Sequence, residues 1–307
     1  MKVRKDYQHF WKNVLLHGQN KMNSLPAAVR IVEVGPRDGF QSIEQTIPTD
    51  AKIQFINTLS EAKLPEIEVT SFVSAKWIPQ LADAQEVSTE IIRDSNILYT
   101  ALIPNIKGLE RALDANYSSV AIFTAASDTF SQKNINCSIK ESITRFQKMK
   151  TSFQDNNMRV RGYISTVWVC PYEGQMEPEN VLPVIDALLE LGIDEISLGD
   201  TIGKATPDDV RNTLDLILSL HDANQFALHF HDTYNHALEN IRVGLEYGIS
   251  TFDSSAGGVG GCPFAPGASG NVSTGSVLNL CKELGIETGV DDQKLSAAVN
   301  FIQSYLN

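Results

Sequence analysis

Long hydrophobic runs are missing from this chain. No apolar stretch in its 307 residues approaches the roughly 20 residues that a membrane-spanning helix needs. No apolar segment of the secretory type opens the sequence either. We therefore expect a protein that neither crosses a membrane nor carries a secretory signal. The 42% share of hydrophobic residues is high enough to build the core of a soluble globular protein.

Basic charge and cysteine are also scarce. The formal net charge of −12 argues against a nucleic-acid partner, because phosphate backbones attract positive surfaces. A local basic pocket for a small anionic substrate is still compatible with this charge. The cysteines include no CxxC pair, so we expect free thiols in a reducing compartment and a cytoplasmic protein. They are Cys137, Cys170, Cys262 and Cys281.

Residues 1–28 differ in charge from the rest of the chain. Their only acid is Asp6, and their lysines and arginines are Lys2, Arg4, Lys5, Lys12 and Lys21. We interpret this segment as a short N-terminal arm on the outside of one catalytic domain at residues 29–307. A mitochondrial presequence is the alternative, and it would place the mature protein in the matrix. Such presequences are usually richer in Arg and Ser.

From residue 30 onward, short apolar runs alternate with amphipathic stretches. The runs are rich in Val, Ile, Phe and Thr, as β-strands are. There are eight of them: 30–35, 66–72, 97–103, 119–127, 159–168, 195–200, 225–232 and 251–258. Between them, residues 49–62 show helical periodicity, and Thr49 is the expected N-cap. Residues 206–221 show it as well, with Thr206 as the expected N-cap and Pro207 in the first turn. Further helices are predicted at 178–192 and 235–248.

This alternation predicts an α/β fold. Eight strand–helix repeats in about 250 residues favour the (β/α)8 TIM barrel. An open, doubly wound sheet of eight strands is the alternative. No low-complexity segment or linker divides the chain, so we predict a single domain. In a barrel, chemistry gathers where the strands end, and polar residues follow several of the predicted strands.

The stretch HFHD at 229–232 ends the seventh predicted strand. Residues two apart on a strand face the same side, so His229 and His231 point together while Phe230 points toward the helices. Two adjacent imidazoles at a barrel mouth favour a metal site, and a hydrogen-bonded pair without metal is the alternative. Asp232 points away from the pair, and we expect it to orient a ligand histidine.

Closure of the barrel would bring the ends of strands one, seven and eight together. Asp38 follows the first strand, and Asn271 lies in the segment after the eighth. With His229 and His231 they form a mixed nitrogen and oxygen shell without thiolate. That shell suits Mg²⁺, Mn²⁺ or a similar divalent cation better than a closed structural zinc site.

Two further residues extend this candidate site. Arg37 precedes Asp38, and it either forms a structural ion pair with Asp38 or Glu68 or stabilises an oxygen that gains charge during a reaction. Cys262 lies in a glycine-rich stretch, GGVGGCPFAPGASG, which we expect to be a mobile loop that closes over the site. A lone cysteine is usually inert, but a nearby cation would lower the pKa of its thiol.

Seven motifs in order carry a family resemblance: EVGPRDGFQ, VTSFVSAKW, KNINCS, CPYEG, EISLGDTIG, HFHDTYNHAL and GGCPFAPGASGN. Together they closely resemble the 3-hydroxy-3-methylglutaryl-CoA (HMG-CoA) lyase family over roughly residues 29–305. The RDG and HxHD motifs are shared with a wider group of metal-dependent barrel enzymes. The loop with Cys262 points to the lyase branch. The chain departs from the family at Trp168, which stands near the barrel mouth where a smaller residue is usual and is expected to narrow the acyl pocket.

The resemblance implies specific roles. Arg37 would stabilise a thioester enolate, Cys262 would transfer a proton, and Glu68 would support the metal shell. Asp200 would lie beside the site and help to shape it. His229 and Asp38 would also be candidates to handle a hydroxyl proton. The divalent cation would be held by Asp38, His229, His231 and Asn271.

The implied reaction is a retro-Claisen-type cleavage of HMG-CoA to acetyl-CoA and acetoacetate, a step of leucine catabolism and ketone-body formation. The substrate would be an acyl-CoA, and Lys133 and Lys140 would be candidate contacts for its nucleotide end. The protein is expected to form a homodimer. A lyase for a larger 3-alkyl analogue, a condensing synthase that uses acetyl-CoA, a metal hydrolase and an inactive binding protein are the alternatives. The few histidines that follow the pair disfavour the hydrolase.

Overall fold

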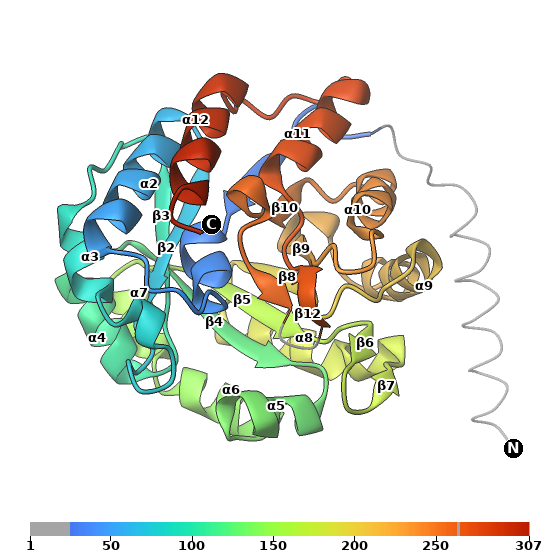
Figure 1. Cartoon of the computed structure of the whole chain (residues 1–307). Coiled ribbons are helices and arrows are strands. Elements are labelled where there is room, and N and C mark those ends of the chain that lie inside the picture. The colour runs from blue at the N-terminus through green and yellow to red at the C-terminus, as the bar shows by residue number, and fades with distance from the viewer. Residues whose placement is uncertain (1–24, 263–264, 307) are drawn as a thin grey trace, which may run out of the picture.

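Eight parallel strands form a closed barrel in the centre of the molecule (Figure 1). The computed structural model describes residues 25–262 and 265–306, and for residues 262 and 265–269 it describes the backbone alone. The barrel strands are β1 (Arg30–Glu33), β2 (Glu66–Ser71), β3 (Leu98–Leu102), β4 (Ser119–Ala125), β5 (Arg159–Ser165), β8 (Glu195–Asp200), β9 (Phe226–Phe230) and β10 (Thr251–Ser254). Their order around the barrel is β1-β10-β9-β8-β5-β4-β3-β2, so the first and last strands are neighbours.

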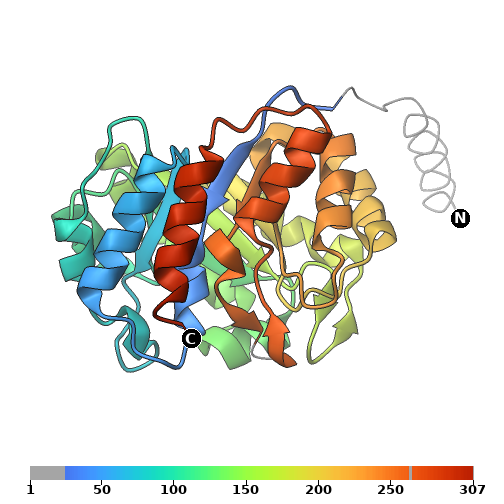
Figure 2. The same ribbon diagram turned by 45° about the horizontal axis from the view of Figure 1, so that its top comes forward.

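Helices surround the barrel as an outer layer (Figure 1). In Figure 2, the red helix α12 stands in the middle of the view beside the blue helix α2, and their contact closes the ring where the chain returns to its start. The helices are α2 (Thr49–Glu61), α3 (Ala84–Glu90), α4 (Ile106–Asp114), α5 (Asp128–Ile135), α6 (Ile139–Gln147), α7 (Lys150–Asp155), α8 (Leu182–Leu191), α9 (Pro207–Leu218), α10 (Ala237–Glu246), α11 (Thr274–Glu283) and α12 (Asp292–Gln303). Short turns of other helix types are η1 (Gly35–Gly39, a π-helix), η2 (Pro79–Leu81), η3 (Pro178–Asn180), η4 (Ala223–Gln225) and η5 (Ala256–Gly258).

The predicted barrel is thus confirmed, and the open sheet is excluded. Each of the eight predicted runs contains one barrel strand. Two small antiparallel hairpins were not predicted. One pairs β6 (Val169–Cys170) with β7 (Gly174–Gln175), and the other pairs β11 (Gly261–Cys262) with β12 (Ala265–Ser269) inside the glycine-rich stretch. That stretch therefore contains a pair of short strands, and its expected mobility stays a prediction.

The two predicted helix caps have different outcomes. Thr49 is the first residue of α2 and not its N-cap, and its hydroxyl donates to the Asp83 carboxylate instead. Thr206 does cap α9, because its hydroxyl accepts from the backbone N–H of Asp209 while the Asp209 carboxylate accepts from the backbone N–H of Thr206. This reciprocal pair satisfies two donors that the helix start leaves free.

Thr206→Ala is expected to lower the free energy of unfolding by about 1 kcal/mol, since it deletes one half of this reciprocal cap. Urea unfolding of the two proteins measures the difference. Thr206→Ser keeps the hydroxyl and is the matched control. A loss in the serine variant as large as in the alanine variant would contradict the capping explanation.

The inside of the barrel is mostly polar, whereas barrels of this type usually fill it with branched apolar side chains. The first residues of four strands form a ring of ion pairs at the amino-terminal end: Arg30, Glu66, Arg159 and Glu195. Above them, Arg161 contacts Glu195 and Asp253, and its own side chain is fully buried. Breaking a buried pair of this kind leaves an uncompensated charge, so the network holds its members in fixed positions.

Apolar packing lies mainly between the barrel and the helices. A smaller apolar group lies inside the barrel on its β3, β4 and β5 side, where Leu102, Ala121 and the Tyr163 ring contact the half-buried Phe123. Within the described residues, no helix is long and apolar enough to cross a membrane.

Candidate metal centre

The turn after β1 places Arg37 and Asp38 at the barrel mouth. The carbonyl oxygen of Val34 accepts from the backbone N–H groups of Arg37, Asp38 and Gly39, at 3.2, 2.7 and 3.2 Å. This widened π-type turn, η1, is a form of helix that is frequent at functional sites. Gly39 is required there, because a Cβ at this position would lie 2.6 Å from the Val259 carbonyl oxygen.

The two histidines come from the end of β9 and face into the barrel. Their ring centroids are 5.3 Å apart, and both side chains are buried. Phe230 points to the other side of the strand, where it stacks on Trp168 at 5.2 Å between ring centroids. The prediction that the histidine pair shares one face is therefore confirmed.

Asn271 joins the histidines because the chain passes back beside β9. Residue pairing links Asn271 to His231, and the flanking backbone bonds run from Asp232 N–H to the Gly270 oxygen and from Val272 N–H to the Phe230 oxygen. The Asn271 side chain consequently lies against Asp38, with its Nδ2 2.9 Å from Asp38 Oδ2.

Asp38, His229 and His231 form one compact cluster. One donor atom from each lies within 4.8 Å of the other two. His231 Nε2 is 3.9 Å from Asp38 Oδ2, which is too long for a hydrogen bond but suits two ligands that share a cation. A carboxylate, two imidazoles and a neighbouring amide form a donor set of nitrogen and oxygen without sulfur.

The charge states of Asp38 and His231 also suit a cation. Burial raises the pKa of Asp38, but the Arg37 guanidinium and the two histidines outweigh it and bring the pKa to about 2. Burial, and next to it His229, lowers the pKa of His231 to about 4. At neutral pH the cluster therefore offers an ionised carboxylate and a neutral His231 ring, the forms that bind metals.

His231 gives a direct test of whether a cation fits. Its Nδ1 is buried and has no hydrogen-bond partner among the described residues, and its Nε2 is too far from Asp38 for a hydrogen bond. Buried polar atoms are almost always paired, so an imidazole without such bonds calls for another partner. A divalent cation between Asp38 and the Nε2 of His231 would give Nε2 such a partner, and the residues present therefore fit a metal at this atom.

Arg37 is clamped beside this cluster. Its Nη1 donates to Asp38 Oδ1 at 2.5 Å, and its Nε donates to the fully buried Glu68. Glu68 also accepts from the Tyr163 hydroxyl at 2.7 Å. Burial lowers the pKa of Arg37, but Glu68 and then Asp38 outweigh it and raise it, so the guanidinium stays charged. Both ion pairs considered from the sequence are therefore present, and Glu68 reaches the metal ligands through Arg37.

The comparison with known families decides what kind of protein carries this centre. A model of the HMGL-like family matches residues 28–302, which is most of the chain. The chain belongs to the HMGL-like family.

Individual HMGL-like relatives agree with this assignment. The cytoplasmic 3-hydroxy-3-methylglutaryl-CoA lyase of Danio rerio is 49% identical over 94% of this chain and 86% of its own length. The mitochondrial hydroxymethylglutaryl-CoA lyase of Macaca fascicularis is 48% identical over 94% of this chain and 89% of its own length. One similar solved structure is an HMG-CoA lyase of Acinetobacter baumannii in complex with coenzyme A and 3-methylmalate. It is 38% identical to this chain, its TM-score is 0.87, and the match covers 92% of this chain and 93% of that chain.

Two aspartates of this HMGL-like site have structural contacts. Asp232 accepts from the backbone N–H of Ala237 at the start of α10. The carboxylate of a third aspartate, Asp253, lies 3.2 Å from His229 Nδ1. Asp200 accepts from the backbone N–H groups of Lys204 and Ala205 and thereby shapes the segment after β8. Burial outweighs these bonds and raises the pKa of Asp200 to about 7.

Three groups named from the sequence lie outside the cluster or outside the described side chains. Lys133 and Lys140 are exposed on α5 and α6, the helices that follow β4, and the Lys133 ammonium lies 4.1 Å from the centre of the Tyr172 ring. The side chain of Cys262 is outside the described part of the structure. Trp168 is buried and stacks on Phe230, which points away from the histidine pair, and its influence on the acyl pocket stays a prediction.

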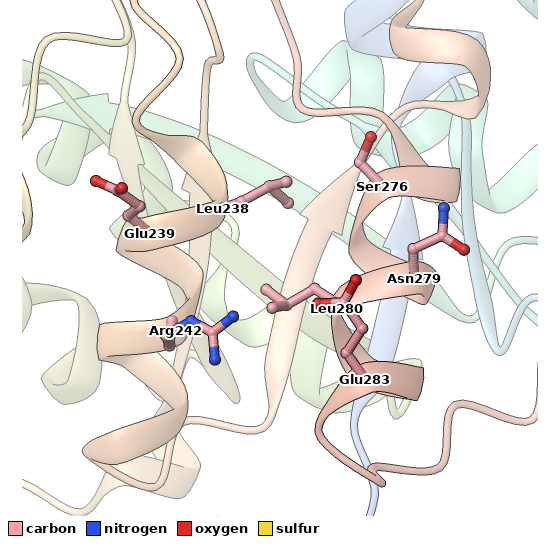
Figure 3. A pocket seen from close by; sticks show the side chains of 7 residues that line it. All are labelled: Leu238, Glu239, Arg242, Ser276, Asn279, Leu280 and Glu283. Carbon is pink, nitrogen blue, oxygen red and sulfur yellow. The ribbon is translucent and has the colours of Figure 1, made fainter.

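Two surface cavities lie beside α11 and not at the barrel mouth. One of about 250 Å³ lies between α10 and α11, where Figure 3 shows Leu238 and Leu280 facing each other with Arg242 below them. The other, of about 360 Å³, lies between α11 and α12. Neither cavity is lined by a residue of the cluster, so donor geometry rather than cavity shape identifies the site.

Proposed function

We propose that this chain is a divalent-metal-dependent lyase that cleaves HMG-CoA to acetyl-CoA and acetoacetate. The HMGL-like family and the lyases to which the chain is similar support this reaction. The observation that carries the proposal within the molecule is the cluster of Asp38, His229 and His231 with a buried cationic side chain, Arg37, directly beside it.

The reaction breaks one carbon–carbon bond, forms one carbonyl group and replaces the bond lost at C2 by a bond to a proton. The 3-hydroxyl of the substrate loses its proton, and its oxygen forms a carbonyl with C3. The C2–C3 bond breaks, and its electrons pass to C2 and the thioester carbonyl as an enolate. Protonation at C2 then gives acetyl-CoA, while the other fragment is acetoacetate. No oxidant or reductant is needed.

The proposed ligands of the cation are Asp38, His229, His231 and Asn271. A divalent cation at this place would lower the pKa of the 3-hydroxyl as a Lewis acid. Their nitrogen and oxygen donors suit Mg²⁺ or Mn²⁺. Asp38 and His229 are also the candidates to receive the hydroxyl proton, because Asp38 is an ionised carboxylate and His229 is an imidazole with the Asp253 carboxylate behind it.

Arg37 is proposed to bind the thioester oxygen as the enolate forms. Glu68 and Asp38 hold two of its nitrogens, Nε and Nη1, so the guanidinium is fixed before the substrate arrives. A charge that needs no rearrangement during the reaction stabilises the transition state more than a mobile one. The apolar side of the barrel at Leu102 and Phe123 would receive the methyl-bearing part of the acyl group.

Two finer points of the proposal concern partners. Lys133 and Lys140 lie on the helices after β4 and would contact the phosphates of coenzyme A, the molecule bound in the Acinetobacter baumannii relative. We also propose a homodimer, which light scattering of the purified protein would test.

Incubation of the purified protein with HMG-CoA, Mg²⁺ or Mn²⁺ and a thiol reductant tests the reaction. Acetoacetate and acetyl-CoA should form in equal amounts, and a chelator should stop their formation. A panel of larger 3-alkyl analogues tests the acyl preference, and a faster reaction with one of them would reassign the substrate. Condensation of acetyl-CoA with a keto acid in place of cleavage would favour the synthase. No turnover in any of these assays would favour a binding protein.

Cys262→Ala is expected to keep the fold and the bound cation but to lose most turnover, since the proposed role of this thiol is proton transfer and not ligation. Acetoacetate release and Mn²⁺ binding are measured on the same preparation. Cys281→Ala, which removes a buried thiol on α11, is the matched control and should retain turnover. Full kcat in Cys262→Ala would remove this residue from the mechanism.

A further inference from the structure

Asp253 lies directly behind one of the proposed metal ligands. It comes from β10, whose register pairs Asp253 with His229 on β9. Its Oδ2 is 3.2 Å from His229 Nδ1, so the ring donates from Nδ1 and keeps the Nε2 lone pair for the barrel mouth. Both groups are buried, and bulk water does not compete for this bond.

The Asp253 carboxylate is itself held rigidly. Arg161 donates to both of its oxygens, from Nη2 at 2.5 Å and from Nη1 at 3.1 Å. Ser197 donates to Oδ2 at 2.9 Å. Arg161 also donates to Glu195 and to the Tyr163 hydroxyl, so it cannot turn without breaking bonds to other strands. Asp253 therefore presents one oxygen to His229 in a fixed direction.

We propose that Asp253 is a positioning residue that fixes the tautomer and the orientation of His229 for metal binding. It contacts neither the proposed substrate position nor the cation, and it acts through the histidine. The proposal rests on the metal-ligand role of His229 proposed above. Outer carboxylates of this kind commonly set the ring orientation and raise the basicity of a ligand histidine.

Asp253→Asn tests the proposal because an amide has a nearly identical shape but carries two donors. If its nitrogen faced His229, the ring proton would move to Nε2 and block the ligand atom. If its nitrogen faced Arg161, donors would oppose each other. We expect Mn²⁺ affinity, measured by electron paramagnetic resonance titration of the full-length protein, to fall by about 10- to 100-fold.

Ser197→Ala is the matched control. It removes one of the hydrogen bonds that hold the same Asp253 oxygen but leaves the contact with His229 and the two bonds from Arg161 in place, so it should lower Mn²⁺ affinity much less than Asp253→Asn does. An equal loss of affinity in both variants would assign the effect to packing and overturn the proposal. Wild-type affinity in Asp253→Asn would overturn it as well.

His229→Ala and His231→Ala separate this inference from the proposed function. If both histidine variants bind Mn²⁺ as tightly as wild type, the metal site lies elsewhere and the proposed function fails. If they lose Mn²⁺ while Asp253→Asn keeps it, only the positioning role fails. The three variants are titrated under the same conditions.

The wild-type protein provides a second readout that does not depend on folding of the aspartate variant. Long-range proton–nitrogen NMR spectra of the Mg²⁺-loaded protein, with ¹⁵N-labelled histidine, report which ring nitrogen carries the proton. His229 should carry it on Nδ1, and its resonances are assigned by their loss in His229→Gln. A proton on Nε2 would overturn the proposal.

Discussion

His231→Ala is expected to abolish both the bound cation and the lyase activity. The substitution removes one of three donors in the cluster, the Nε2 that faces Asp38 across 3.9 Å. Loss of an outer partner of a ligand already costs 10- to 100-fold in affinity, so loss of the ligand itself should cost more than about 100-fold. Mn²⁺ titration and acetoacetate release measure the two effects.

His236→Ala is the matched control for this experiment. His236 lies five residues further along, at the start of α10, and it does not belong to the cluster. The two variants should have similar melting temperatures, because the His231 ring leaves no hydrogen-bonded partner behind at its Nδ1. A His231→Ala protein that binds Mn²⁺ as well as the control would refute the ligand assignment.

Arg37→Gln is expected to lower kcat by about 100- to 1,000-fold, the usual effect of removing one preorganised donor at a developing oxyanion. Mn²⁺ binding should persist in this variant. The guanidinium competes with a cation for the Asp38 carboxylate, and its removal takes that competitor away. This result would differ from that of the control His236→Ala, which should keep both turnover and metal, and from that of His231→Ala, which should lose both.

The buried partner of Arg37 requires its own control. Arg37→Gln leaves Glu68 buried without its cation, which can destabilise the fold by about 3–5 kcal/mol. The double variant Arg37→Gln with Glu68→Gln removes both charges and should recover stability but not kcat. Recovery of kcat in the double variant would show that Arg37 is needed only to neutralise Glu68.

The barrel could be predicted from the sequence because its strands are fully covered by helices. A strand buried on both faces is rich in apolar residues, and Val, Ile, Phe or Thr occurs in each of the eight runs. The two hairpins, β6 with β7 and β11 with β12, could not be found in this way. Three of their four strands have only two residues and show no periodicity, and the glycines in the second hairpin are also typical of loops.

The histidine pair, Asp38 and Asn271 could be placed together because barrel closure makes strands one, eight and seven neighbours. The contact between Asp253 and His229 could not be predicted from the sequence. Asp232 is near the histidines in sequence, but Asp253 is near them through the register of β9 and β10. Sequence spacing alone does not give the register between two strands.

The polar interior is the second feature that sequence reading missed. In β5, Arg159, Arg161 and Tyr163 alternate, which places all three on one face of a strand. In β10, the acid Asp253 stands at the third of four positions, between Phe252 and Ser254. Charged residues at alternate positions of barrel strands are a sign of an ionic interior. They also indicate which strands carry the side chains that contact the metal ligands, as Asp253 on β10 contacts His229.

A crystal of the protein soaked in Mn²⁺ tests the central claim most directly, because the anomalous scattering of the ion locates it without reference to any assumed ligand. We predict one strong peak at the barrel mouth, within bonding distance of the four proposed ligands, Asp38, His229, His231 and Asn271. A peak at another place in the molecule, or these side chains lying too far apart to share one ion, would contradict the account.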